Sequence, residues 1–458
     1  MHGQTAQRCT AESIPLDFSW NHDPSALTEI PDLVPAEPGP EQVADLELLS
    51  ECLRDGLQGV DVCPTVDAMV QYLHLLHGFG IRYATVGIYP GRSSGLSDRM
   101  KGVLARMRDE LPGLTPSVLS LCTDDSLAWA RECQEIHPAL QSVVFMGSAP
   151  SRRLVQGWDL PFIVDRLGTY IQRTVALGIP VVAGTEHTTQ TSPEDLRAII
   201  EAQVQGGAYC VGIADTIGIV RPVGAYRITR FVRQELDRLG RPEVLIDWHG
   251  HRDTGNALGN VFAAAAAGAN RFHVVSRGVG ERSGNTSLEE VALNFAAILS
   301  EESMTVPWDM TGLLGLVTRY QQMVGIAPPE HGVLGRRYNH TTSGIHTDAM
   351  LKAHAMADLA REAGDSELAD RLLLMARTVY SAVDPASVGG GSSVGVSPWS
   401  GRSTVMLAHR ADGRDPGQLT PELIERVLAR VNELGRELTP TELAECYADR
   451  LVVSGVAR

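Results

Sequence analysis

The sequence predicts a (β/α)8 TIM barrel followed by a linker and a small, mainly helical C-terminal domain. Two features of the chain predict this fold. Between about Leu46 and Ser300, short apolar runs alternate with longer amphipathic stretches, which is the pattern of successive βα units. Charged and polar residues also follow several of the apolar runs directly, and in a parallel barrel such positions meet at one face.

The apolar runs are the expected strands, and the amphipathic stretches between them are expected helices. The strands are predicted at 47–53, 82–88, 114–121, 140–146, 179–185, 208–214, 243–248 and 270–275. Helices are predicted at 64–79, 158–177, 193–206, 220–238, 253–267 and 286–299. A doubly wound open sheet would show the same alternation. Polar residues after four different runs favour the barrel, because its chemistry gathers at the strand ends.

The chain is expected to have four parts and to lack a regulatory domain. Residues 1–45 are rich in Pro, Glu, Ser and Thr and predict an irregular extension. Residues 46–305 form the expected barrel and residues 306–350 a linker subdomain. Residues 351–458 form the expected helical domain, with helix-like runs at 419–434 and 439–450.

The composition is that of a core-forming globular protein, with 43% hydrophobic and 21% charged residues. A formal net charge of −16 argues against nucleic acid and anionic membranes as partners. The seven cysteines are scattered without a C-x-x-C pair, so neither a disulfide framework nor a zinc knuckle is indicated. No run approaches the ~20 apolar residues of a membrane span, and no signal peptide is recognisable, so a cytoplasmic location is expected.

Two short motifs after expected strands suggest a metal site. His249 and His251 form an H-x-H pair, and residues i and i+2 share one face of a strand. Both imidazoles could therefore reach one divalent ion, with Asp55 supplying a carboxylate oxygen. Arg54 stands directly before that acid. The alternatives are satisfied polar side chains at a strand end for the H-x-H pair and a surface turn for Arg54-Asp55.

Five segments in one order resemble a known superfamily. They are ECLRDGLQG at 51–59, IADTIGIVRP at 213–222, WHGHRDTGNALGN at 248–260, GVGERSGNTSLEEV at 278–291 and TSGIHTDAMLK at 342–352. The first resembles the D-T-T-L-R-D-G-E-Q signature of the isopropylmalate synthase, homocitrate synthase and hydroxymethylglutaryl-CoA lyase superfamily. The resemblance implies a metal-dependent Claisen condensation of acetyl-CoA with a 2-oxo acid, followed by thioester hydrolysis to a 2-hydroxy dicarboxylate and CoA.

The resemblance also implies a divalent metal cofactor, which would be Mg2+, Mn2+, Co2+ or Zn2+. Asp55, His249 and His251 would be its ligands, with Asn285 a further ligand or a neighbour of the ligands. Arg54 would stabilise the oxygen that becomes negative when the keto carbon is attacked.

Three further roles follow from the resemblance. Thr216 and Gln58 would bind substrate, and Thr216 would donate to the substrate carboxylate. Glu186 and His346 match positions that transfer the proton from the acetyl methyl group. His346 belongs to the S-G-I-H segment beyond the barrel, so the expected state is a homodimer in which it reaches the partner's site.

Substrate choice is where the chain departs from the superfamily's pattern. Ala84-Thr85 stands where strand two usually has Ile-Glu, so an acidic group near the metal residues is expected to be missing. The strand-five pattern E-D-x-x-R-T/S reads Glu186-His187-Thr188-Thr189-Gln190-Thr191 here. Four arginines around the expected barrel mouth favour an anionic 2-oxo acid, with a homocitrate-, citrate- or phosphonomethylmalate-type product. They are Arg92, Arg152, Arg153 and the substrate-binding candidate Arg277.

Three alternatives stay open. The first is an isopropylmalate or citramalate synthase that takes an apolar 2-oxo acid. The second is a carbon–carbon lyase resembling hydroxymethylglutaryl-CoA lyase, but such lyases lack the S-G-I-H segment and use a cysteine near G-x-G-E-R that is not seen here. The third is a noncatalytic metal-binding barrel, which would leave the whole set of motifs idle.

Overall fold

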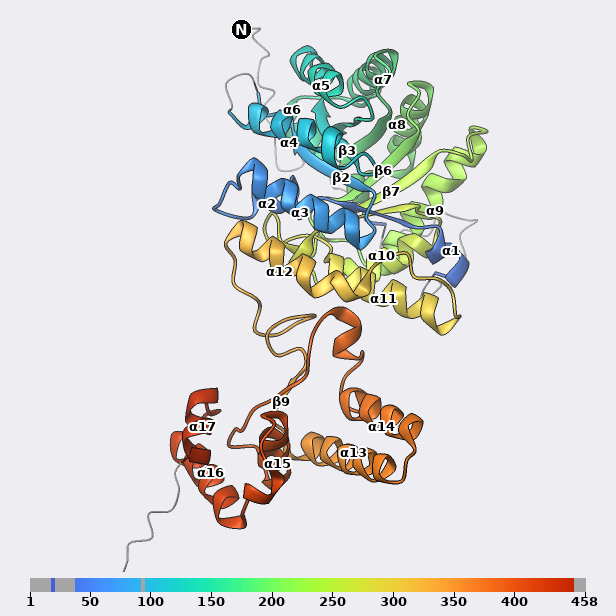
Figure 1. Cartoon of the computed structure of the whole chain (residues 1–458). Helices are drawn as coiled ribbons and strands as arrows, with labels where there is room; N and C mark the ends of the chain where they lie inside the picture. Colours follow the sequence, from blue (N-terminus) through green and yellow to red (C-terminus); the bar gives the residue numbers. More distant parts are fainter. Residues whose placement is uncertain (1–17, 21–37, 92–94, 449–458) are drawn as a thin grey trace, which may run out of the picture. The chain divides into compact units, whose positions relative to one another are not determined.

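Eight parallel strands form a closed barrel in sequence order in the computed structural model (Figure 1). The structure describes residues 18–20, 38–91 and 95–448. The strands are β1 (Glu47–Ser50), β2 (Tyr83–Ile88), β3 (Thr115–Leu121), β4 (Gln141–Gly147), β5 (Val181–Glu186), β6 (Cys210–Asp215), β7 (Leu245–Gly250) and β8 (Arg271–Val274). The predicted fold class, a TIM barrel with a helical C-terminal region, is confirmed.

The first and last strands close the barrel, with Leu48 opposite Phe272 and Ser50 opposite Val274. β1 is shorter than the predicted run 47–53, because the chain turns after Ser50 into the one-turn helix α2 (Asp55–Gln58). Residues 51–54 form that turn, at the carboxyl end of β1.

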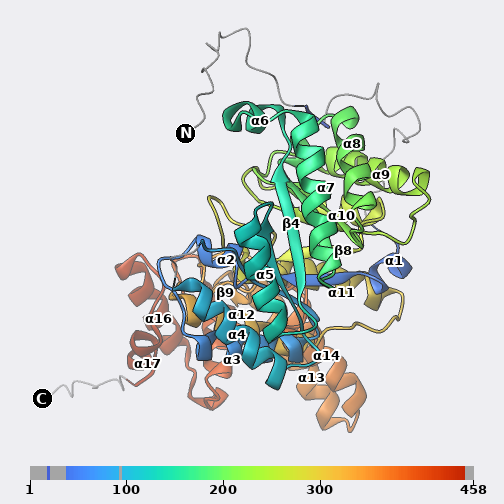
Figure 2. The same cartoon turned by 90° about the horizontal axis from the view of Figure 1, so that it is seen from above.

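Helices form the outer layer of the barrel. They are α3 (Val66–Phe79), α4 (Leu96–Glu110), α5 (Asp124–Ile136), α6 (Pro150–Gln156), α7 (Leu160–Ala176), α8 (Pro193–Gln205), α9 (Pro222–Arg238), α10 (Ala257–Ala266) and α11 (Leu288–Glu301). Short 3-10 turns η2 (Thr188–Gln190) and η3 (Ser276–Gly278) follow β5 and β8. Figure 2 shows α7 lying along β4. Within the described residues, no helix is both long and apolar enough to span a membrane.

Local sequence explains where these helices begin. Thr65 caps α3 by accepting a hydrogen bond from the Ala68 amide, and Ser192 caps α8 in the same way through the Asp195 amide. Pro193 then occupies the first turn of α8, where a missing N–H costs nothing. The buried faces of the helices complete the core, and Ile163, among them, is 0% exposed.

A short segment near the N-terminus is anchored on the barrel. Trp20 is 0% exposed, and its indole N–H donates to the Thr191 carbonyl at 3.0 Å. Its ring lies 5.3 Å from that of Phe231 on α9, and Phe18 N donates to the Gln190 carbonyl. The helix α1 (Pro40–Ala44) leads into β1. Residues 1–17 and 21–37 of the predicted extension 1–45 lie outside the described residues.

The chain divides into two compact units, and each is described by itself. Unit 1 comprises residues 1–309 and 315–327, and unit 2 comprises residues 310–314 and 328–458. Unit 1 therefore includes most of α12 (Leu313–Val324). The elements of unit 2 are η4 (Met310–Gly312), β9 (His340–Thr341), α13 (Gly344–Glu362), α14 (Ser366–Thr378), η5 (Pro385–Val388), β10 (Ser393–Val394), α15 (Arg402–Ala411), η6 (Pro416–Gln418), α16 (Pro421–Leu434) and α17 (Pro440–Ala448). The expected boundary at residue 350 falls inside α13, because the S-G-I-H segment opens that helix.

Candidate active site at the carboxyl ends of the strands

A cavity of about 310 Å³ opens at the carboxyl ends of the barrel strands. Seven of the ten residues proposed from sequence for the site line it. They are Arg54, Asp55, Gln58, Glu186, Thr216, and the His249 and His251 pair. Because the carboxyl ends of all eight strands meet here, residues almost two hundred positions apart share one cavity.

Asp55, His249 and His251 form a cluster that suits a divalent metal ion. One ligand atom from each lies within 4.8 Å of the others. Burial lowers the pKa of His249 well below its usual value, the Arg54 charge lowers it further, and burial also lowers the pKa of His251. Burial by itself raises the pKa of Asp55, but the Arg54 charge, the two imidazoles and the hydrogen bond from Asn285 together outweigh burial and hold the pKa below its usual value. Neutral imidazoles and an ionised carboxylate are the forms that bind metal.

Asn285 provides an independent test of whether the cluster fits a cation. Its Nδ2 donates to Asp55 Oδ1 at 2.6 Å and to the Val279 carbonyl at 3.1 Å. Its Oδ1 is buried and has no hydrogen-bond partner within the described residues. A buried amide oxygen without a partner is costly unless something electropositive faces it. The donor set of one carboxylate, two imidazoles and one amide oxygen therefore fits a divalent ion.

The loop after β8 depends on glycine to hold this cluster together. Gly280 has φ 151°, and a Cβ there would lie 2.7 Å from Asp55 Oδ1 and overlap Asn285 Nδ2. A side chain at residue 280 would thus push the loop away from two residues of the cluster.

Arg54 lies between the metal cluster and a second buried carboxylate. Its Nη1 donates to Asp55 Oδ2 at 2.6 Å and its Nε to Glu51 Oε2 at 2.7 Å. Thr85 Oγ1 donates to the other oxygen of Glu51 at 3.0 Å. The expectation that Thr85 leaves this region without an acidic group is wrong, because Glu51 brings a carboxylate to the same point from the turn after β1.

A row of side chains of alternating charge continues from Glu51 across the barrel to His273, Asp247 and Arg271. The sequence did not predict this row. His273 Nδ1 lies 3.0 Å from Glu51 Oε1, and its Nε2 lies 3.2 Å from Asp247 Oδ2. Arg271 Nη2 donates to that same oxygen at 2.7 Å. Burial alone lowers the pKa of His273, but its contacts with Asp247 and Glu51 outweigh burial and raise it. The sequence did contain a signal for these buried charges, because Arg271 and His273 alternate with apolar residues in β8 and so share one face of the strand.

Two other candidates lie on the rim of the cavity. Thr216 accepts a hydrogen bond from the His187 amide at 2.7 Å, which leaves its own hydroxyl proton available for a ligand. Glu186 ends β5, and Arg152 Nε donates to its Oε2 at 3.2 Å. Both side chains line the cavity.

Arg277 does not reach the cavity. It has a left-handed φ of 65°, and its side chain lies 3.6 Å from Glu289 and donates to Gln321 at 3.2 Å. The two other rim arginines that the structure describes, Arg152 and Arg153, are both paired with acids. Arg152 pairs with Glu186 and Arg153 with Asp195, while Arg92 lies outside the described residues.

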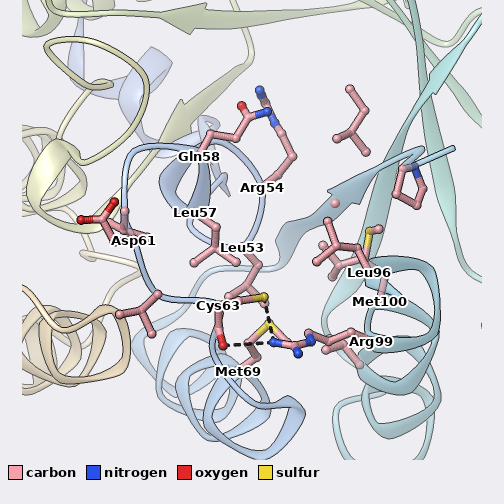
Figure 3. A pocket seen from close by; sticks show the side chains of 17 residues that line it. Leu53, Arg54, Leu57, Gln58, Asp61, Cys63, Met69, Leu96, Arg99 and Met100 are labelled. Carbon is pink, nitrogen blue, oxygen red and sulfur yellow. Dashed lines mark hydrogen bonds between the residues drawn. The ribbon is translucent and has the colours of Figure 1, made fainter. Parts of the chain in front are cut away.

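The cavity wall opposite the metal cluster is apolar. It is formed by side chains of β2 to β6, namely Ile88, Leu119, Val143, Phe145, Val182 and Ile213. A side pocket of about 390 Å³ adjoins the cavity and shares Arg54, Gln58 and Ile88 with it. Figure 3 shows Arg54 and Gln58 at one end of this pocket and Cys63 with Arg99 at the other, where Arg99 donates to the Cys63 carbonyl at 3.0 Å. Most of its lining is apolar.

His346 belongs to unit 2. It lies in the first turn of α13, and its ring stacks on Tyr380 with a centroid separation of 3.9 Å. Its action on a barrel site, and the homodimer that would bring it there, stay predictions.

Comparison with known proteins places the barrel in a family. A family model described as HMGL-like matches residues 45–314, and the chain belongs to this family. The resemblance predicted from the sequence motifs is thereby confirmed. The solved structure of hydroxymethylglutaryl-CoA lyase from Pseudomonas aeruginosa is similar in fold, with a TM-score of 0.51, 20% identity, and coverage of 64% of this chain and 95% of that one.

Among individual relatives, sequence similarity extends beyond the barrel. A 2-isopropylmalate synthase of Pyrococcus furiosus is 26% identical over 87% of this chain and 74% of its own length. Homocitrate synthase AksA of Methanopyrus kandleri is 25% identical over 86% of this chain and 90% of its own length. A third relative, named as an (R)-citramalate synthase from the same archaeon, is 28% identical over 67% of this chain. The matched region spans 58% of the length of that relative.

Proposed function

We propose that this protein condenses acetyl-CoA with a 2-oxo acid and hydrolyses the resulting thioester, in a reaction that requires a divalent metal ion. The observation that carries the proposal is Arg54 hydrogen-bonded to Asp55 beside His249 and His251. Two relatives named as synthases match 86–87% of the chain and a third matches 67%, whereas the lyase structure covers 64%. This difference favours condensation over cleavage, because residues beyond the barrel are shared with synthases.

Asp55, His249 and His251, with Asn285, would hold the metal. When bound there, a divalent ion supplies Lewis-acid polarisation of the keto group and a chelation point for the 2-oxo acid. Arg54 would face the keto oxygen, where its guanidinium stabilises the negative charge that develops.

Side chains near the metal cluster would transfer the protons and hold the substrate while bonds form and break. A base takes a proton from the acetyl methyl group, that carbon forms a bond to the keto carbon, and the keto oxygen becomes a hydroxyl group. Water then cleaves the thioester and CoA leaves with its thiol proton. Glu186 on the rim and His346 are the proposed groups for the first proton, while the Thr216 hydroxyl donates to the substrate carboxylate.

The 2-oxo acid is proposed to have an apolar side chain. The sequence favoured an anionic one, but Arg277 is turned away and the described rim arginines are paired with acids. The wall of Leu119, Phe145 and their neighbours would instead bury a methyl or branched alkyl group. This supports the citramalate or isopropylmalate type of product over the homocitrate or phosphonomethylmalate type.

A panel of 2-oxo acids tests the proposal. CoA release from acetyl-CoA is measured with pyruvate, 2-oxobutyrate, 2-oxoisovalerate, oxaloacetate and 2-oxoglutarate, after chelation and after return of Mg2+, Mn2+, Co2+ or Zn2+. Phe145→Ala should shift preference towards the larger apolar acids by about 10-fold or more. Preference for oxaloacetate or 2-oxoglutarate would refute the apolar assignment. Release of no CoA with any acid would return the lyase alternative to first place.

The side pocket is proposed to take the pantetheine arm of acetyl-CoA, since it is apolar and opens beside Arg54. Leu96 lines this pocket and is 48% exposed, so Leu96→Asp should fold normally. It should raise the KM for acetyl-CoA about 10-fold with no change in KM for the 2-oxo acid. Leu75→Asp is the matched control, because Leu75 is 45% exposed and lines neither cavity. An equal effect of the two variants would contradict the assignment.

The homodimer is proposed because His346 lies in a different unit from the metal cluster. Mixing inactive Arg54→Ala chains with inactive His346→Ala chains should restore part of the activity, since some sites would combine an intact barrel with His346 of the partner subunit. Absence of recovery after proven subunit exchange would count against this arrangement.

A further inference from the structure

Glu51 is a buried carboxylate whose position is unusual for the family pattern. It is 0% exposed, it accepts from Arg54 Nε at 2.7 Å, and Thr85 donates to it at 3.0 Å. Thr85 itself is 0% exposed and extends from β2. Residues 51 and 85 therefore meet side chain to side chain, one from the turn after β1 and the other from β2.

The two residues are exchanged relative to the signature. Aligned with D-T-T-L-R-D-G-E-Q, Glu51 stands where the pattern has threonine, and Thr85 stands where strand two usually has glutamate. Because these side chains touch, a carboxylate at residue 51 or at residue 85 would reach the same point beside Arg54. The resemblance thus implies one acidic group at that point in either arrangement.

We propose that Glu51, in the turn after β1, is the positioning residue for Arg54, and that its carboxylate occupies the point that the strand-two glutamate of the resembled pattern would reach from β2. This inference rests on the proposed function only for the role of Arg54 in the reaction. Glu51 and Asp55 together hold two nitrogens of the guanidinium, Nε and Nη1. Within the described residues the third, Nη2, has no hydrogen-bond partner, and Arg54 lines the cavity. Two charge-assisted hydrogen bonds thus fix the plane of the group and leave one edge for substrate.

An exchange of the two side chains tests the pairing without substrate. Glu51→Thr leaves Arg54 and His273 without this buried partner, and Thr85→Glu places two carboxylates at one point. Each single variant should unfold at a lower denaturant concentration than the wild type. The double variant Glu51→Thr/Thr85→Glu should unfold at a higher concentration than either. A double variant no more stable than Glu51→Thr would overturn the inference, whether or not the protein releases CoA.

The same variants test the consequence for catalysis. Glu51→Thr should lower kcat by about 10²–10³-fold and change the KM for the 2-oxo acid by less than about threefold. The double variant should recover at least about 10-fold of that loss. Glu235→Thr is the control, because Glu235 is a 5% exposed acid paired with two arginines on the outer helix α9. It should lose stability and keep kcat.

These outcomes separate the two proposals. A wild-type protein that releases no CoA would sink the proposed function, and the unfolding measurements would still decide the pairing. An active wild type, with Glu51→Thr equally active or the folded double variant no faster than Glu51→Thr, would overturn the positioning role alone.

Discussion

Replacing Arg271 with methionine tests the energetics of the buried charges in the barrel. Arg271 is 2% exposed and Asp247 is 1% exposed. Arg271 Nε lies 3.0 and 3.1 Å from the two oxygens of Asp247, and Nη2 lies 2.7 Å from one of them. The guanidinium also sits 4.7 Å from the centroid of the Tyr83 ring. In Arg271→Met, Asp247 loses its contacts with the guanidinium and keeps the contact with His273, at 3.2 Å.

The expected loss follows from the charge that is left behind. Removing one partner of a buried ion pair costs about 3–5 kcal/mol, most of it from the uncompensated charge. Arg271→Met should therefore lower the free energy of unfolding by about that amount. Arg271→Met/Asp247→Asn should lose less than the sum of the two single variants, because no unpaired carboxylate remains. The coupling should exceed about 1 kcal/mol.

Denaturant unfolding followed by tryptophan fluorescence provides the assay. Five of the six tryptophans lie in unit 1, at residues 20, 129, 158, 248 and 308, so the signal reports mainly on the barrel. A chelator is present throughout, because bound metal would stabilise the folded state by mass action. A loss below about 1 kcal/mol for Arg271→Met, or additive losses in the double variant, would refute this account of the charges.

Three further outcomes are expected. Asn285→Ala should weaken metal binding by about 10–100-fold, measured by calorimetry with Mn2+, and unchanged affinity would show that its amide oxygen faces no ion. Trp20→Ala should cost about 3–5 kcal/mol of unfolding free energy, and a loss near zero would contradict its anchoring role. Burial raises the pKa of Asp215 to about 6 from 3.8, so this acid binds a proton more tightly in the folded state. Its contribution to stability is present at low pH and is lost as pH rises through about 6, so Asp215→Asn should flatten the fall in stability over that range; an unchanged pH slope would refute it.

The barrel was predictable because its signals are local. Alternating apolar runs and helix caps such as Thr65 and Ser192 depend on neighbours a few residues apart, and the H-x-H spacing of His249 and His251 puts two imidazoles at one strand end. The strand ends then converge because a parallel barrel has only one carboxyl face. Residues whose position depends on that geometry alone, such as Thr216, were therefore predictable as well.

The rest depends on contacts that no local pattern encodes. Glu51 meets His273 only because β1 and β8 close the barrel, and it meets Thr85 only through the pairing of β1 with β2. The apparent loss of an acid at Thr85 was misread for that reason. Arg277 was misplaced because its side chain lies against Glu289 and Gln321, at a turn residue with a left-handed φ of 65°. Charge counts at a loop do not reveal such a turn.

The anchor at Trp20 has a consequence for how the chain is made. Its partner, Thr191, follows it by 171 positions. At typical synthesis rates of about 5–20 residues per second, roughly 10–30 s separate the two residues as they leave the ribosome. During that interval a large indole ring has no binding place in the barrel, because the loop after β5 and the helix α9 do not yet exist. Trp20 is therefore made well before its binding place, and the growing chain carries an aromatic side chain without that place until the loop after β5 and α9 have been made.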